Sequence, residues 1–246
     1  MKFAVITDIH GNAPALIAVL NEIDRMRDIE HIYCLGDMIG IGPDTNEVLN
    51  ILFSRSDVSM ITGNHDEAIL ALIKGEKHPE SHLHAREHHQ WIANQMDQSY
   101  VPNLEKLPRM LKVNIESQSI IFTHYHIDIE RMNDHISQEP FSSIVEPSLE
   151  NMKTLFSNRH EDVIFFGHHH PVHYFKGEKT LFVNPGSLGC THEPFAPYAI
   201  VNIDNSRIEV VLEKASYDNK KFLLSYEKLQ VPDREFILSV FHGNQC

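Results

Sequence analysis

Short apolar runs recur along the chain, and each ends in a small residue followed by a polar residue that can bind a metal ion. The runs cover residues 5–7, 32–36, 60–63, 120–123 and 163–167 and lead to Asp8, Asp37, Asn64, His124 and His168. Nearly continuous apolar runs of this length are typical of strands that are buried on both faces. Because ligands of open α/β sheets bind at the carboxyl ends of the strands, these five strand ends predict one shared site.

Helical spacing lies between the early strands. Apolar residues recur three and four positions apart at Leu16, Val19, Leu20 and Ile23. Asn12 can cap this first helix, with Pro14 at an early helical position. A second helix is predicted over about residues 46–53. The alternation of strand and helix as far as residue 66 predicts right-handed parallel crossovers.

The pattern changes after residue 66. Helices are expected over 67–74, 81–98, about 148–157, 218–229 and 233–241, a loop over 125–147, and hairpins that pair 110–115 with 120–122, 172–175 with 180–183, and 198–203 with 208–212. The hairpins predict a second, mixed sheet packed on the first. A chain of 246 residues with this pattern is expected to form one α/β domain, 1–246, with a helical insertion or cap at about 67–104.

The charge balance limits the kinds of partner. The formal net charge is −13, so no basic face is available for a nucleic-acid polymer. A small phosphorylated substrate remains compatible, because bound metal ions supply positive charge locally. No apolar run approaches 18 residues, and residues 1–6 already resemble a strand. We therefore expect a soluble, cytoplasmic protein without a membrane partner, and the sequence leaves its oligomeric state open.

Histidine is unusually frequent, with 18 histidines against 21 lysines and arginines. The candidate ligands at the strand ends are two carboxylates, one amide and four imidazoles: Asp8, His10, Asp37, Asn64, His124, His168 and His170. This set is too large for one ordinary cation and suits two, with a carboxylate bridging them. The mixture of imidazole and carboxylate favours manganese, iron or zinc over calcium.

The stretch from Gly63 to Asp66 adds two catalytic candidates. His65 can carry a proton, and Asp66 can orient the His65 ring. A structural hydrogen-bonded pair in a turn is the alternative explanation. His126 is a candidate substrate contact, because it lies two residues beyond the ligand His124.

A further histidine cluster lies in the predicted helix 81–98 and comprises His82, His84, His88 and His89. His84 and His88 are four residues apart, so they share one helix face and could bind zinc. A solvated helix face is the explanation favoured here. A third possibility is that this helix covers the cleft and meets the substrate.

Taken in order, the motifs resemble those of the calcineurin-like metallophosphoesterases. They are Asp8-x-His10, Gly36-Asp37, Gly63-Asn64-His65-Asp66, His124 and Gly167-His168-x-His170, and the resemblance extends from Asp8 to about Gly189. Each motif alone is weak, but all five in this order are specific. The resemblance implies a four-layer α-β-β-α sandwich with two mixed sheets.

The resemblance also implies a role for each residue. Asp8, His10, Asp37 and His170 would hold one metal ion, and Asp37, Asn64, His124 and His168 the other, with Asp37 bridging. A metal-bound hydroxide would attack phosphorus. His65 would contact the phosphate and protonate or stabilise the leaving oxygen, oriented by Asp66.

Departures from the family pattern narrow the range of candidate substrates. Protein phosphatases of the family carry arginines beside the Gly-Asp and Asn-His motifs, where this chain has Met38 to Gly40 and Glu67-Ala68. Many small relatives follow the histidine equivalent to His124 with Gly-Ser, where this chain has Tyr125-His126. We expect hydrolysis of a phosphodiester or phosphoanhydride in a small, nucleotide-like substrate. A phosphomonoesterase, a protein phosphatase, a nuclease acting on polymer ends and a non-catalytic metal-binding scaffold are the alternatives.

Overall fold

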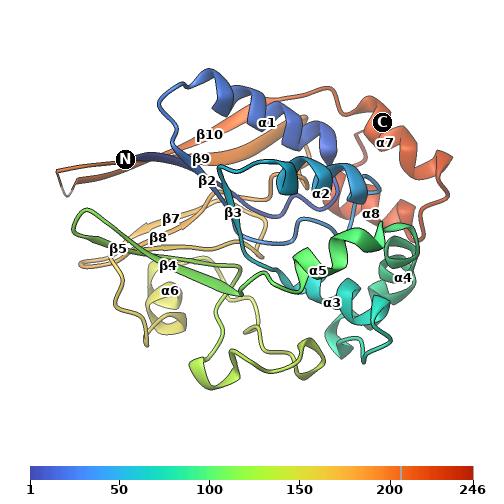
Figure 1. Ribbon diagram of the computed structural model, residues 1–246, viewed down its shortest axis with the longest axis horizontal. Helices are drawn as coiled ribbons and strands as arrows, with labels where there is room; N and C mark the ends of the chain where they lie inside the picture. Colours follow the sequence, from blue (N-terminus) through green and yellow to red (C-terminus); the bar gives the residue numbers. More distant parts are fainter. Residues whose placement is uncertain (206, 246) are drawn as a thin grey trace.

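Two mixed five-stranded sheets lie face to face at the centre of the computed structural model, which describes residues 1–205 and 207–245 (Figure 1). The first sheet has the order β10-β9-β1-β2-β3, formed by Arg207–Ser216, Phe195–Asp204, Lys2–Ile6, His31–Cys34 and Val58–Met60. The second has the order β4-β5-β6-β8-β7, formed by Met110–Ile115, Gln118–Thr123, Val163–Phe165, Leu181–Asn184 and His173–Lys176. The parallel arrangement of β1, β2 and β3 is confirmed.

The apolar runs are continuous because each face of a central strand packs against a different layer. In β1, Phe3 and Val5 enter the core between the two sheets, whereas Ala4 and Ile6 enter the core under the helices. The rings of Phe3 and Phe122 meet across the sheets with centroids 6.0 Å apart. Burial on both faces therefore fixes the register of β1, since a shift by one residue would exchange its two faces.

Helices cover the outer face of each sheet. Helices α1 (Ala13–Arg25) and α2 (Thr45–Ser54) pack on the first sheet, and α6 (Leu149–Leu155) packs on the second (Figure 1). Asn12 caps α1 as predicted, because its side chain accepts a hydrogen bond from the backbone N–H of Ala15. The expected four-layer α-β-β-α sandwich is confirmed.

The three predicted hairpins are present: β4 pairs with β5, β7 with β8 and β9 with β10, all antiparallel. The third is longer than predicted, because each of its strands has ten residues. Along the chain between β5 and α6, the expected loop 125–147 contains the short 3-10 helices η3 (Ile129–Arg131) and η4 (Ile136–Gln138) and one isolated β-bridge, between Ile127 and Phe141.

Two helix boundaries differ from the prediction. Helix α3 covers Asn64–Ile73, so the Asn-His-Asp stretch forms its first turn instead of preceding it. The expected helix over 81–98 is divided into the 3-10 helix η1 (Glu80–Ala85) and α4 (Arg86–Gln95). Two short elements follow, η2 (Gln98–Tyr100) and α5 (Val101–Leu104). The interpretation of 67–104 as an inserted cap stays a prediction.

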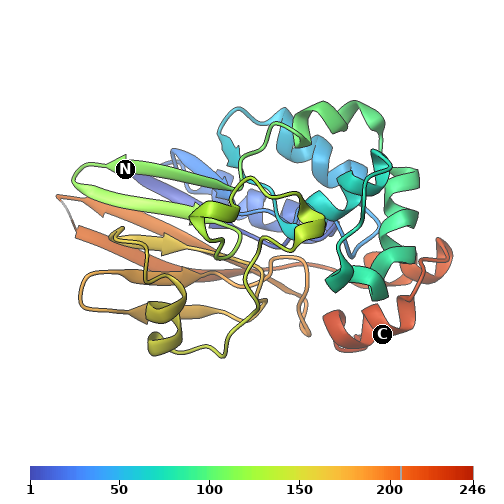
Figure 2. The same cartoon turned by 90° about the horizontal axis from the view of Figure 1, so that it is seen from below.

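The chain ends with helices α7 (Lys220–Lys228) and α8 (Arg234–His242), close to their predicted positions. Figures 1 and 2 place these two helices beside α4, at the end of the sheets where β1, β2 and β3 terminate. Within the described residues, the protein has no helix that is both long and apolar enough to cross a membrane.

Candidate metal centre

The seven predicted ligands converge at the carboxyl ends of β1, β2, β3, β5 and β6. Two groups of three have ligand atoms that all lie within 4.8 Å of one another: Asp8, His10 and His170, and Asp37, His124 and His168. Strands of both sheets contribute to the centre, so neither sheet could form it alone.

In the first group, three side chains point at one position. Nε2 of His10 lies 3.6 Å from Oδ1 of Asp8 and 3.1 Å from Nε2 of His170. Nε2 of His170 lies 3.9 Å from the same Asp8 oxygen. Two imidazole nitrogens that face each other beside a carboxylate oxygen are arranged as ligands of a shared cation.

Asp37 lies between the two groups. Its Oδ2 is 3.8 Å from Nε2 of His10 in the first group and 3.2 Å from Nε2 of His124 in the second. The amide oxygen of Asn64 completes the second group, 2.9 Å from Nε2 of His124 and 2.7 Å from Nδ1 of His168. One carboxylate therefore reaches both positions.

Four of the ligands have left-handed backbone conformations. The φ angles are 53° for Asp8, 50° for His10, 49° for Asp37 and 65° for His168. Residues other than glycine rarely adopt this conformation, and each instance costs of the order of 1 kcal/mol or more. The surrounding fold maintains this strain where it turns the ligands inward from the strand ends.

The hydrogen bonds around the ligands test whether the centre fits metal ions. Oδ2 of Asp8 accepts bonds from the Thr7 hydroxyl and the backbone N–H of His168, but Oδ1 is buried without any hydrogen-bond partner. Nδ1 of His124 bonds the carbonyl of Leu35, which leaves Nε2 as the ligand atom. An orphaned buried carboxylate oxygen facing imidazole nitrogens fits a divalent cation, so we conclude that this is a divalent-metal site.

The charges of the carboxylates and imidazoles at the centre stabilise one another. Burial opposes ionisation of Asp8 and Asp37, yet the neighbouring imidazoles hold the pKa of both carboxyls below its usual value. Burial also opposes protonation of His124, but the Asp37 carboxylate raises the pKa of His124 to about 9. Burial lowers the pKa of His168 to about 3 and that of His170 to about 4. Neutral imidazoles are the form that binds metal.

The orienting contact predicted for Asp66 is wrong. Its two carboxylate oxygens accept bonds from the backbone N–H groups of Gly63, at 2.9 Å, and Ile39, at 3.2 Å. Asp66 thus caps the first turn of α3, because a carboxylate satisfies amides that a helix start leaves free. Burial and the Asp37 charge raise the pKa of Asp66 to about 7.

The His65 ring is held by another histidine. Nδ1 of His65 lies 2.9 Å from Nε2 of His89, and Nδ1 of His89 lies 2.9 Å from Nε2 of His78. Burial, followed by the positive charges of His89 and His82, lowers the pKa of His65 well below its usual value. Sequence reasoning missed His78 and did not connect His89 with His65. The excess of histidines was the only available signal.

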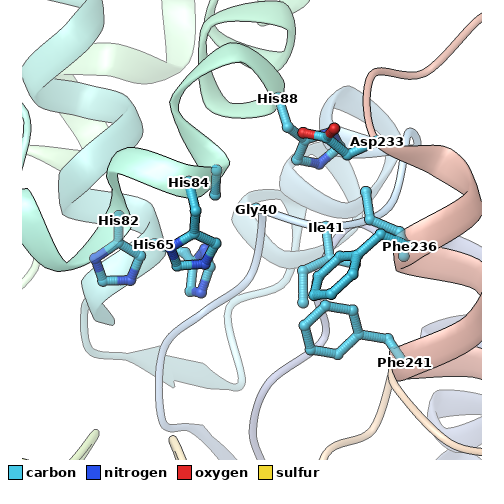
Figure 3. Close-up of a pocket in the computed structure, with 11 residues that line it drawn as sticks. Gly40, Ile41, His65, His82, His84, His88, Asp233, Phe236 and Phe241 are labelled. Atoms are coloured by element: carbon cyan, nitrogen blue, oxygen red, sulfur yellow. The ribbon is translucent and has the colours of Figure 1, made fainter.

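Three histidines of η1 and α4 line a cavity beside His65. His82, His84 and His88 border a cavity of about 390 Å³ together with His65 (Figure 3). The favoured interpretation, a solvated helix face, is wrong for His88 and His89, which are buried. Nor do His84 and His88 belong to a metal-binding group among the described residues. The third possibility, a helix that covers the cleft, matches this geometry.

His126 is buried near the second ligand group. Its Nδ1 lies 2.8 Å from the Ser142 hydroxyl, and its ring packs against Phe156 with centroids 5.5 Å apart. Nothing in this arrangement tests a contact with substrate, which stays a prediction.

Comparison with known proteins adds independent information. Residues 1–206 match the model of the calcineurin-like phosphoesterase superfamily domain. An uncharacterized protein of Methanocaldococcus jannaschii is 28% identical over 243 residues, which cover 92% of this chain and 90% of the relative. The symmetrical bis(5'-nucleosyl)-tetraphosphatase of Salmonella paratyphi A is 35% identical over 76 residues, only 30% of this chain and 27% of that enzyme.

A solved structure shares the whole architecture. The crystal structure of a hypothetical protein from Pyrococcus horikoshii has a TM-score of 0.78 with this chain at 21% sequence identity. The match covers 100% of this chain and 99% of the other. Both chains therefore have the same fold, including the part beyond residue 206.

Proposed function

Because the chain belongs to the calcineurin-like phosphoesterase superfamily, and is thereby a metal-dependent phosphoester hydrolase, we propose that it cleaves a phosphodiester or phosphoanhydride bond in a small, nucleotide-like substrate. The observation that carries this proposal is the position of Asp37 between two complete ligand groups. Two cations about 3.5–4 Å apart are the arrangement that clamps both sides of a phosphoryl displacement.

We propose that Asp8, His10, Asp37 and His170 hold one cation, and that Asp37, Asn64, His124 and His168 hold the other. Manganese, iron and zinc suit this donor set. When bound, such cations neutralise phosphate charge and lower the pKa of water. The protein's own contribution is to fix the ligand positions through the strained strand ends and the hydrogen bonds behind the ligands.

His65 is proposed as the residue that meets the leaving oxygen. Nδ1 of His65 and Nε2 of His89 lie 2.9 Å apart, and we assign His89 as the donor of this bond, which places the proton of the neutral His65 ring on Nε2. The backbone N–H of His65 donates to Oδ1 of Asp37, so the ring is anchored beside the ligand that both groups share. A donor fixed in this way can protonate or stabilise an oxygen that gains charge as its bond to phosphorus breaks.

Three features support a small substrate. The net charge of −13 disfavours a nucleic-acid polymer. Met38 and Ile39, which follow the bridging Asp37, are fully buried and offer no cationic contact to a phosphoprotein. The partial similarity to symmetrical bis(5'-nucleosyl)-tetraphosphatases favours a nucleotide over other small phosphoesters.

The test is kcat/KM of manganese-loaded protein on four substrates: an aryl phosphate monoester, an aryl diester, a cyclic nucleotide and a dinucleoside polyphosphate. Preference for a nucleotide diester or anhydride is the expected result. A preference for the monoester would contradict the proposed bond type. Absence of hydrolysis with two metal equivalents bound would indicate a metal-binding scaffold.

A further inference from the structure

An apolar cavity opens beside His65. It lies between η1, α4 and α8, has a volume of about 390 Å³, and has Ile41, Phe236 and Phe241 as its apolar wall (Figure 3). This volume is within the range of roughly 300–1,000 Å³ that small-molecule sites occupy. Phe236 is 55% exposed, although burying such a ring is favourable.

The cavity adjoins the proposed catalytic centre at His65. The Phe241 ring lies 5.6 Å from the ring of His170, measured between centroids, and the His65 ring forms part of the cavity wall. A leaving group that departs next to His65 would therefore enter this space. Phe236 and Phe241 belong to α8, which lies outside residues 1–206, so the family match does not assign them a role.

Two polar groups are placed on this apolar wall. The Asp233 carboxylate lies above Phe236 and next to His88, as Figure 3 shows. His88 is only 3% exposed, yet neither of its ring nitrogens has a hydrogen-bond partner. A few polar groups on a largely apolar surface fix the orientation of a bound ligand.

A second cavity of about 430 Å³ lies on the other side of His82, next to the ligands Asn64 and His168. It is lined by Glu80, Glu139, Ser142 and Ser143 together with the apolar side chains of Ile136 and Phe141. Two glutamates line this second cavity, whereas two phenylalanines of α8 line the first. A flat aromatic group is therefore expected in the first cavity.

We propose that the cavity between α4 and α8 binds the nucleobase of the leaving nucleotide, stacked on Phe236 with its N–H groups directed to Asp233. The Phe241 ring is inclined by 84° to that of Phe236, so it would meet the edge of the base. This assignment rests on the proposed function, because it places the leaving group beside His65. Stacking on aromatic side chains accepts any base, and the few polar groups then select among bases.

The binding test uses AMP and ribose 5-phosphate, which carry the same phosphate and differ in the base. Trp91, the one tryptophan of the chain, stacks on His88 with ring centroids 6.1 Å apart, so its fluorescence reports on the cavity without turnover. In zinc-loaded protein, we expect AMP to bind at least tenfold more tightly than ribose 5-phosphate. Phe236→Ala should remove most of this difference and leave the affinity for ribose 5-phosphate unchanged.

Leu224→Ala is the matched control, because Leu224 lies on α7, is 68% exposed and is not among the residues that line this cavity. Equal affinities in the wild type, or a preference for AMP that survives Phe236→Ala, would overturn the assignment. The assignment would also be overturned if Phe236→Ala changed the oligomeric state and left the affinity for AMP unaltered. The exposed Phe236 surface would then mediate self-association instead of nucleobase binding. Absence of hydrolysis on the four substrates contradicts the proposed function whatever the fluorescence shows.

Discussion

Nδ1 of His65 lies 2.9 Å from Nε2 of His89, so the proposed catalytic ring is positioned by a histidine that is itself fully buried. His89 is held in turn by His78 at 2.9 Å. The two bonds couple the proton positions of the three rings, because every bond requires one donor and one acceptor. In the direction proposed above, His78 donates to His89 and His89 donates to His65. His89 is therefore a positioning residue for His65.

His89→Phe should lower kcat by about ten- to 100-fold while KM and metal content stay near those of the wild type. The substitution keeps an aromatic ring in the buried position but removes the hydrogen bond to His65. His89→Gln supplies an amide N–H donor and should restore part of kcat. Steady-state kinetics and metal analysis of the three proteins provide the test. An equal loss in the Phe and Gln variants would indicate a purely structural role.

His65→Ala should keep both metal ions and lose roughly 10²–10⁴-fold in kcat, the usual contribution of general acid–base catalysis. Asp37→Ala should lose metal as well as turnover, because Asp37 Oδ2 reaches ligand atoms of both groups. Metal content by mass spectrometry, measured beside kcat, separates the two outcomes. An unchanged kcat in His65→Ala would contradict the catalytic role assigned to His65.

Much of the architecture could be predicted from local pattern. Both faces of the central strands are buried, so their apolar runs are unbroken, and the polar residues that end them stand out. The ligands Asp8 and His168 are 160 residues apart and belong to strands of different sheets, yet each follows a buried strand. This position at a strand end made the ligands visible in the sequence, whereas the packing of the two sheets brings them together.

The partners of His65 could not be predicted in the same way. Asp66 is adjacent in sequence, but the first turn of α3 directs its carboxylate to the amides of Gly63 and Ile39. His89 is 24 residues away on another helix, and its approach to His65 depends on how α3 and α4 pack. Periodicity reports which face of a helix is buried, but it does not report which buried polar groups meet.

Gly63→Ala should reduce metal affinity by about ten- to 100-fold, as expected when the support of a ligand is disturbed. A Cβ atom at Gly63 would overlap the Asp37 carboxylate and its backbone nitrogen, so the bridging ligand would have to move. Gly75→Ala is a matched control. Gly75 has a φ of +70°, but a Cβ there would meet no atom within 4 Å. The control should lose only about 1 kcal/mol of stability. Equal metal affinities for the two variants, by competition with a chelator, would contradict the close-approach argument.

His173→Leu should stabilise the protein, and more at pH 5 than at pH 7.5. His173 is 1% exposed, and neither of its ring nitrogens has a hydrogen-bond partner. Burial, followed by the charge of His169, lowers the pKa of His173 to about 4 in the folded state, against 6.5 for an unperturbed histidine. As the pH falls from 6.5 towards 4, the unfolded chain therefore gains a proton that the folded protein does not, and stability is lost.

Leucine removes both the unsatisfied nitrogens and this proton linkage. Gaining about 1 kcal/mol would raise the Tm by about 2–4 °C in a chain of this size. His31→Leu is the control, because Nε2 of His31 bonds the Ser59 hydroxyl at 2.8 Å and its replacement sacrifices a hydrogen bond. Thermal unfolding of the three proteins at both pH values is the measurement. A Tm of His173→Leu that falls below that of the wild type at pH 5 would show that the ring is satisfied in solution.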